Sequence, residues 1–296
     1  MEESLILFAI ASPLIMIVGL SFKFYQISKM PFNIRWEIYP LPLENGKRRH
    51  YGGSYLEEVD WVNKPHKKSF IKEFTEPLKE ILYLHRVKEF NTYGLWLWSM
   101  ALHWGIWLLF TWVILLFITL IFDNFSISKF SFIPYLSYFL GSFGSLALII
   151  KRISNKELKL YTSGIDYLNL VFLLSIFVTG ILMILSGDFI EETLSYINGV
   201  VHLNLSLSEL STFTVIHFLL FEVFLVYIPF SRFFHGPVKF FTFHKILWDD
   251  EYQKKDSPEE KRISQQLNYR VLWAGPHILP NQTWLENAKN TNLHEK

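Results

Sequence analysis

The sequence predicts an all-α integral membrane protein with five transmembrane helices, and two observations carry this prediction. Of its 296 residues, 51% are hydrophobic and 18% aromatic, and the mean hydropathy is positive. That excess of apolar residues is more than a soluble core of this length would bury. The chain also contains five windows nearly free of charge, each long enough at ~1.5 Å per residue to cross the ~30 Å hydrocarbon core of a bilayer.

The five windows are residues 5–25, 95–122, 132–150, 165–187 and 213–234. The first follows Met1-Glu2-Glu3 without a basic region, which favours a retained helix over a signal peptide. Tryptophans at the start of the second are typical of a membrane interface, and Gly141 and Gly144 in the third favour close helix packing. The predicted organisation is a first transmembrane helix (1–25), a loop (26–93), a four-helix membrane bundle (94–234) and a tail (235–296).

The charges of the short loops predict the orientation. The link between the third and fourth windows carries four basic residues, whereas the link between the fourth and fifth carries four acids and no basic residue. By the positive-inside rule the first link is cytoplasmic and the amino terminus is outside the inner membrane. The loop 26–93 and the carboxyl-terminal tail would then both be cytoplasmic, as a docking platform or as solvated segments without a partner.

Composition also excludes several classes of cofactor and partner. The chain has no cysteine, so it holds no disulfide, no iron–sulfur cluster of its own, no thiolate metal site and no covalently attached c-type haem. The formal net charge is +1 and no basic stripe stands out, so nucleic acid is not an expected partner. Membrane lipid is the partner that the apolar windows imply.

Three histidines occur in or at the end of the predicted spans. His217 and His235 are eighteen residues apart, which is five turns of an α-helix, so both fall on one face about 27 Å apart. Pro229 lies between them and could kink that helix. His103 lies in the cytoplasmic half of the second span, where it could ligate a haem iron opposite His235 or bond a neighbouring carbonyl. Gly105 could leave room for the macrocycle.

Two charged residues of the fifth window are further candidates. Glu222 is the only carboxylate deep in that window, and it could accept quinol protons or be a protonated group bonded to a neighbouring helix. Its offset from His217 is ~140°, which predicts that the two side chains do not share a face. Arg232 could bind a haem propionate through its guanidinium or extend to lipid phosphate.

Several motifs resemble a known family. YIPFSRFFH at residues 227–235, with a histidine eighteen residues before its own, and LHWGI at 102–106 resemble the nitrate reductase gamma-subunit family of membrane b-type cytochromes. Four further segments are similar to the cytochrome subunits of Hmc-, Tmc- and Dsr-type redox complexes of sulfate reducers. They are NIRWEIYPLP (33–42), YGGSYLEEVDW (51–61), FFTFHKILWDD (240–250) and AGPHILPNQTW (274–284).

The resemblance implies a quinol-linked oxidoreductase subunit of anaerobic respiration. Electrons would pass, in either direction, between menaquinone or another quinone and a cytoplasmic iron–sulfur subunit, with the substrate chemistry in partner subunits. His103 and His235 would ligate an inner haem b, and His217 an outer one.

Where the family has a second histidine on the early helix, this chain has Val113. One haem is therefore expected and a second stays an open alternative. His217 could instead pair with Met183 or His202, bind quinol, or be structural. A non-redox transporter or structural anchor with packing histidines is the alternative function.

Overall fold

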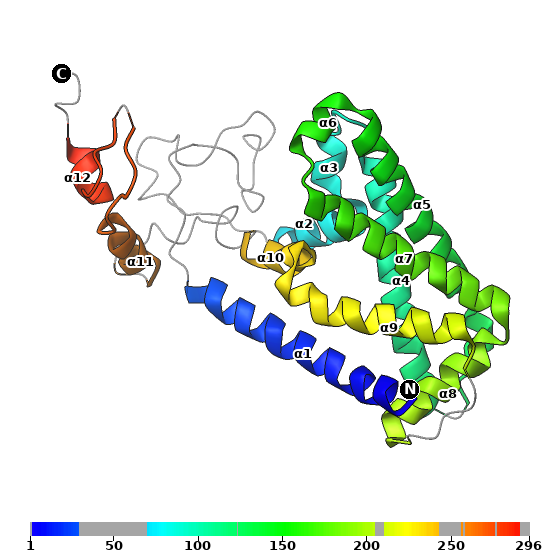
Figure 1. Ribbon diagram of the computed structural model, residues 1–296. Helices are drawn as coiled ribbons and strands as arrows, with labels where there is room; N and C mark the ends of the chain where they lie inside the picture. The colour runs from blue at the N-terminus through cyan, green and yellow to red at the C-terminus, as the bar shows by residue number, and fades with distance from the viewer. Residues whose placement is uncertain are drawn as a thin grey trace. The chain divides into compact units, whose positions relative to one another are not determined.

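Long helices dominate the computed structural model, which describes residues 2–29, 70–122, 124–204, 210–242, 256, 258–275 and 277–290 (Figure 1). The helices are α1 (Glu2–Lys29), α2 (Phe70–Tyr83), α3 (His85–Glu89), α4 (Trp96–Ile121), η4 (Ile127–Phe130), α5 (Phe132–Ser154), α6 (Lys156–Tyr161), α7 (Gly164–Ser186), α8 (Phe189–His202), α9 (Thr212–Tyr227), η5 (Ile228–Phe230), η6 (Arg232–Phe234), α10 (His235–Thr242), α11 (Pro258–Leu267) and α12 (Trp284–Lys289). The described residues contain no strand beyond two isolated bridges. The predicted all-α class is confirmed.

Within the described residues, five helical segments are long and apolar enough to cross a membrane. They are Ser4–Lys29, Trp96–Ile121, Ile127–Ser154, Gly164–Ser186 and Thr212–Phe230. Each overlaps one of the predicted windows, and the third begins earlier because the 3-10 turn η4 precedes α5. The prediction of a multi-pass membrane protein with five spans is therefore confirmed by length and apolar character.

The chain divides into two units. The first contains Met1–Ser21 and Lys79–Phe234, and the second contains Phe22–Leu78 and His235–Lys296. In the first unit α5 packs against both α4 and α7, α7 packs against α9, and α8 contacts α4, α7 and α9. The boundaries predicted from sequence lay after residues 25, 93 and 234, whereas the units change after residues 21, 78 and 234.

Glycines set the closest helix contact of the first unit, between α4 and α5. A Cβ on Gly105 would lie 2.6 Å from the Cα of Gly141, and one on Gly144 would lie 2.5 Å from the backbone nitrogen of Leu102. The carbonyl of Gly105 also accepts a hydrogen bond of 2.7 Å from Ser137. The packing role predicted for Gly141 and Gly144 is confirmed. The expectation that Gly105 leaves room for a macrocycle is wrong, because the backbone of α5 occupies that side of α4.

The fifth span does not continue as one α-helix to Phe234. α9 ends at Tyr227, and two 3-10 turns follow, separated by Ser231 in an extended conformation (φ −122°, ψ 179°). Pro229 explains the break, because proline has no N–H to donate and its ring crowds the carbonyl of the preceding turn. The predicted alignment of His217 and His235 on one helical face is therefore wrong.

The second unit contains a small folded segment in the tail. The bridge between Arg270 and Thr283 closes it, and the amide of Asn287 bonds the backbone of Leu279 on both sides, at 2.7 and 3.2 Å. α11 precedes this segment in the tail. The AGPHILPNQTW motif folds here, with Pro276 outside the described residues. The motifs at 33–42 and 51–61, and residues 243–250 of the FFTFHKILWDD motif, also lie outside them.

Candidate functional site

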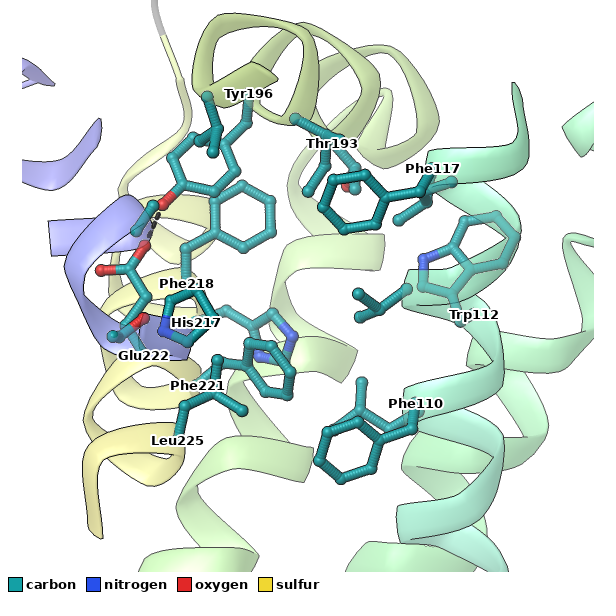
Figure 2. Close-up of a pocket in the computed structure, with 18 of the residues that line it drawn as sticks. Phe110, Trp112, Phe117, Thr193, Tyr196, His217, Phe218, Phe221, Glu222 and Leu225 are labelled. Atoms are coloured by element: carbon teal, nitrogen blue, oxygen red, sulfur yellow. Dashed lines mark hydrogen bonds between the residues drawn. The ribbon is translucent and has the colours of Figure 1, made fainter. Parts of the chain in front are cut away.

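A cavity of about 260 Å³ lies inside the first unit, and most of its wall is apolar. Figure 2 shows α9 along one side with Glu222 and His217, α4 along the opposite side with Trp112 and Phe110, and Tyr196 of α8 across one end. Residues of α1, α5 and α7 complete the wall. We call this space the His217 cavity. It lies among the predicted spans, toward the end of the unit that carries the acidic helix α8.

His217 is 3% exposed and both of its ring nitrogens are bonded. Nδ1 lies 3.0 Å from the carbonyl oxygen of Ile176 and 3.3 Å from the hydroxyl of Thr179, and Nε2 lies 3.1 Å from the hydroxyl of Tyr138. A carbonyl can only accept, so Nδ1 carries the proton and Nε2 accepts from Tyr138. The structure therefore describes His217 as a neutral imidazole fixed by α5 and α7.

Glu222 is also 3% exposed and lines the same cavity as His217. One carboxylate oxygen, Oε1, accepts a short hydrogen bond from the hydroxyl of Tyr196 (Figure 2). Glu222 and His217 lie in one regular α-helix, so the predicted angular offset between them stands, yet both side chains line the same cavity. The ~140° rotation holds for the helix axis, but the cavity is wide enough to be lined by both side chains.

Four buried polar atoms of the lining have no hydrogen-bond partner among the described residues. They are the hydroxyls of Ser12 and Thr193, the indole Nε1 of Trp112 and the second carboxylate oxygen of Glu222. An unpaired polar atom away from water costs about 1–3 kcal/mol. Most buried polar groups are bonded. Four orphans around one apolar space therefore indicate that a ligand or water with polar groups belongs in this cavity.

His103 lies on α4 and does not line this cavity. Its Nδ1 is 2.6 Å from the carbonyl oxygen of Ser99, one helical turn earlier. A metal-binding histidine is commonly oriented in this way, with one ring nitrogen bonded to a backbone carbonyl and the other toward the metal. The bond to Ser99 fixes the orientation of the His103 ring against its own helix.

The residues considered as partners of His217 fall in different places. Val113 and Met183 both line the His217 cavity, whereas His202 is exposed at the end of α8, with Nδ1 3.1 Å from the carbonyl of Asn198. Val113 has no atom that can bind iron, and Tyr138 already bonds Nε2 of His217. The described residues around His217 therefore do not fit a haem held by two imidazoles.

Arg232 pairs with the carboxylate of Asp166 at the start of α7. Asp166 also accepts from the backbone and hydroxyl of Ser163, so it closes a capping box at the helix start. The guanidinium expected at a propionate is thus part of a contact between α7 and η6. His235 begins α10 and belongs to the second unit, and it is exposed within the described residues.

Sequence reasoning missed most of the polar lining. The sequence patterns do not distinguish Tyr138, Tyr196 and Trp112 from the other aromatic residues of the chain, nor Thr193 from its other hydroxyl residues. Two signals were available. Tyr138 lies in an apolar run of the third window, and Phe189–His202 has polar residues on one face and apolar residues on the other, as expected of a helix lying across a bundle.

The described residues contain no group of three or more His, Cys, Asp or Glu side chains placed to hold a metal ion. The fold and the cavity define an all-α multi-pass membrane protein with a buried, mainly apolar site between its helices. Comparisons with family models, with curated proteins and with solved structures find no match for this chain.

Proposed function

We propose that the protein is a membrane b-type cytochrome subunit that exchanges electrons with a quinone pool, and that the His217 cavity binds the quinone. One observation carries the proposal. Four buried polar atoms without partners surround an otherwise apolar space, beside the His217–Tyr138 pair. A quinone head group has a flat apolar ring with oxygens at opposite edges. Its oxygens can accept from the hydroxyl and indole donors, and its hydroquinone form can donate to a carboxylate.

The dimensions support a head group as the ligand. The cavity volume of about 260 Å³ is just below the range of about 300–1,000 Å³ typical of pockets that enclose a drug-sized molecule. Aromatic rings line the space, including Phe110, Phe221 and the stacked pair of Tyr196 and Phe218, whose centroids are 4.1 Å apart. Flat aromatic surfaces of this kind favour a planar ligand.

Haem b is the proposed partner of this site within the same subunit. His103 of α4 would help to hold the haem, as the family resemblance of LHWGI implies. Bound haem would supply a one-electron carrier. His217 is proposed as a fixed hydrogen-bonding group of the quinone site, because Tyr138 already bonds its Nε2.

The direction across the membrane is part of the proposal. Lys151, Arg152, Lys156 and Lys159 lie at the connection from α5 to α7, and the positive-inside rule assigns that end to the cytoplasm. The His217 cavity then lies in the outer half of the membrane. The loop and the tail would face an iron–sulfur subunit in the cytoplasm.

Spectroscopy of the purified full chain tests the haem part. We expect a b-type α band on reduction, its loss in His103→Ala, and its retention in His202→Ala, which removes an exposed histidine. A reduced protein without that band would contradict the cytochrome assignment and favour a transporter or structural anchor. Quinone binding is tested separately, by quenching of tryptophan fluorescence with menadione, because Trp112 lines the cavity.

A further inference from the structure

The two oxygens of the Glu222 carboxylate have different surroundings. We propose that Glu222 accepts a proton from hydroquinone bound in the His217 cavity, and that Tyr196 is the positioning residue that holds its carboxylate. The inference rests on the proposed quinone function of this cavity. Oε1 accepts from the Tyr196 hydroxyl, whereas Oε2 is buried and has no partner among the described residues. One oxygen is thus fixed and the other is left for a ligand.

Tyr196 is well placed to hold the carboxylate without competing for the proton. Its ring stacks on Phe218 with centroids 4.1 Å apart and an angle of 16° between the planes. Burial raises the pKa of the Tyr196 phenol, and the neighbouring carboxylate of Glu222 raises it further. The phenol therefore stays protonated and donates its hydrogen to Oε1.

The other titratable groups around the cavity are already occupied. Only His217 of α9 and Tyr138 of α5 line it besides Glu222 and Tyr196, and α1, α4 and α7 contribute no titratable lining residue. Nδ1 of His217 donates to Ile176, and its Nε2 accepts from Tyr138. Oε2 of Glu222 is therefore the one basic atom of the lining that accepts no hydrogen bond from a described residue.

The proposed step transfers a proton and leaves the electrons on the quinol. An O–H bond of the hydroquinone breaks, a new O–H bond forms on Oε2, and the bonding pair stays on the quinol oxygen. The deprotonated quinol would be the species that is oxidised, and a ferric haem held by this subunit, as the proposed function supplies, would be the one-electron acceptor. Thr193 lies one turn before Tyr196 on α8 and has an unpaired hydroxyl in the lining, where a water could take the proton onward.

The experiment compares three variants of the full chain with the wild type. Glu222→Gln keeps the size and an acceptor for Tyr196 but removes the base, Tyr196→Phe removes only the positioning bond, and Glu191→Gln removes an exposed acid of α8 as the matched control. Menadione binding is measured by quenching of tryptophan fluorescence. The rate at which menadiol reduces the haem of the subunit is measured across a pH series.

We expect Glu222→Gln to bind menadione as the wild type does. Its reduction by menadiol should be about 100-fold slower, as for loss of a general base. The plot of its rate against pH should lack the inflection on the acid side that the wild type shows. Tyr196→Phe should keep an inflection at a shifted pH, and Glu191→Gln should match the wild type. An infrared difference spectrum on adding menadiol should show a new protonated-carboxyl band that moves in Glu222→Asp.

The outcomes separate this inference from the proposed function. A wild type that fails to bind menadione overturns the quinone function itself. A wild type that binds menadione while Glu222→Gln keeps its rate and pH profile overturns the role of Glu222 alone. If Glu222→Gln does not fold, the infrared spectrum of the wild type decides, because absence of a protonated-carboxyl band contradicts the proton transfer.

Discussion

The hydroxyl of Tyr138 donates to Nε2 of His217 across 3.1 Å within the apolar interior of the first unit. The ring centroids are 5.2 Å apart and the planes meet at 76°. Gly180 makes this contact possible, because a Cβ there would lie 2.7 Å from the Tyr138 ring. The pair joins α5 to α9 across α7, and it holds the imidazole in one orientation at the wall of the cavity.

Replacing Tyr138 with phenylalanine should leave Nε2 of His217 as a buried acceptor without a donor. We expect a loss of about 1–3 kcal/mol in the free energy of unfolding, measured from thermal or denaturant unfolding in detergent. Tyr135→Phe is the control, because that side chain is 51% exposed on the same helix. Equal stability of the two variants would contradict the importance of this bond.

The volume of the cavity gives a second prediction. Val113 lines it, whereas Ile114, the next residue, is 59% exposed on the outside of α4. A tryptophan at position 113 should fill the space and lower menadione affinity at least tenfold, which is ~1.4 kcal/mol. Ile114→Trp should bind menadione as the wild type does. Equal affinity in both variants would place the ligand elsewhere.

Close packing of α4 on α5 gives a third prediction. Gly144→Ala places a methyl group 2.5 Å from the backbone of Leu102, where no flexible side chain can move away. Overpacking of this kind typically costs about 1–3 kcal/mol, which should appear as a lower midpoint of thermal unfolding. Gly164→Ala is the control, since nothing lies within 4 Å of the added Cβ.

Asp166 and Arg232 should contribute unequally to stability. The side chain of Arg232 is 61% exposed, and exposed ion pairs contribute only about 0–1 kcal/mol. Asp166 additionally closes the capping box of α7 with Ser163, and loss of a cap costs about 0.5–2 kcal/mol. We therefore expect Asp166→Ala to lower the unfolding free energy more than Arg232→Ala does. The reverse order would mean that Arg232 has a further ligand.

The tail gives a prediction about pH. Hydrogen bonds from the backbone and the hydroxyl of Thr283 hold the pKa of Glu286 below its usual value of 4.5. A depressed carboxyl pKa stabilises the folded state above the unfolded pKa, and that stability is lost as the pH falls through the folded pKa. Protection of the α12 amides from hydrogen exchange, measured relative to the intrinsic exchange rate at each pH, should fall on acidification below about pH 4.5, and Glu286→Gln should remove this dependence.

The spans were predictable because hydropathy and length are local properties of the sequence. Each of the five windows overlaps a helix of sufficient length, and the small residues Gly141 and Gly144 lie where close packing was expected. Helical spacing does not predict the position of a side chain where a single residue changes the path of the backbone. Pro229 ends α9, so a rotation counted along an ideal helix from His217 to His235 does not describe the chain.

The site was only partly predictable because its members come from six helices. His217 and Glu222 are rare polar residues of a hydrophobic span and stand out by themselves. Tyr138, Tyr196 and Trp112 are aromatic residues in an aromatic-rich chain, and only packing shows which of them face inward. Glu222 and His217 likewise line one cavity because the cavity is wide, and its width cannot be predicted from the spacing of residues along a helix.

The unpaired atoms of the cavity also affect how much of this protein a cell could accumulate. The hydroxyl of Ser12, the indole nitrogen of Trp112 and two further polar atoms have no hydrogen-bond partner among the described residues. A ligand that binds only the folded chain adds about 2.7 kcal/mol at a hundred times its dissociation constant. On the proposed function that ligand is a quinone, so the folding yield should follow the supply of quinone, and a membrane depleted of quinone should contain fewer copies of the chain.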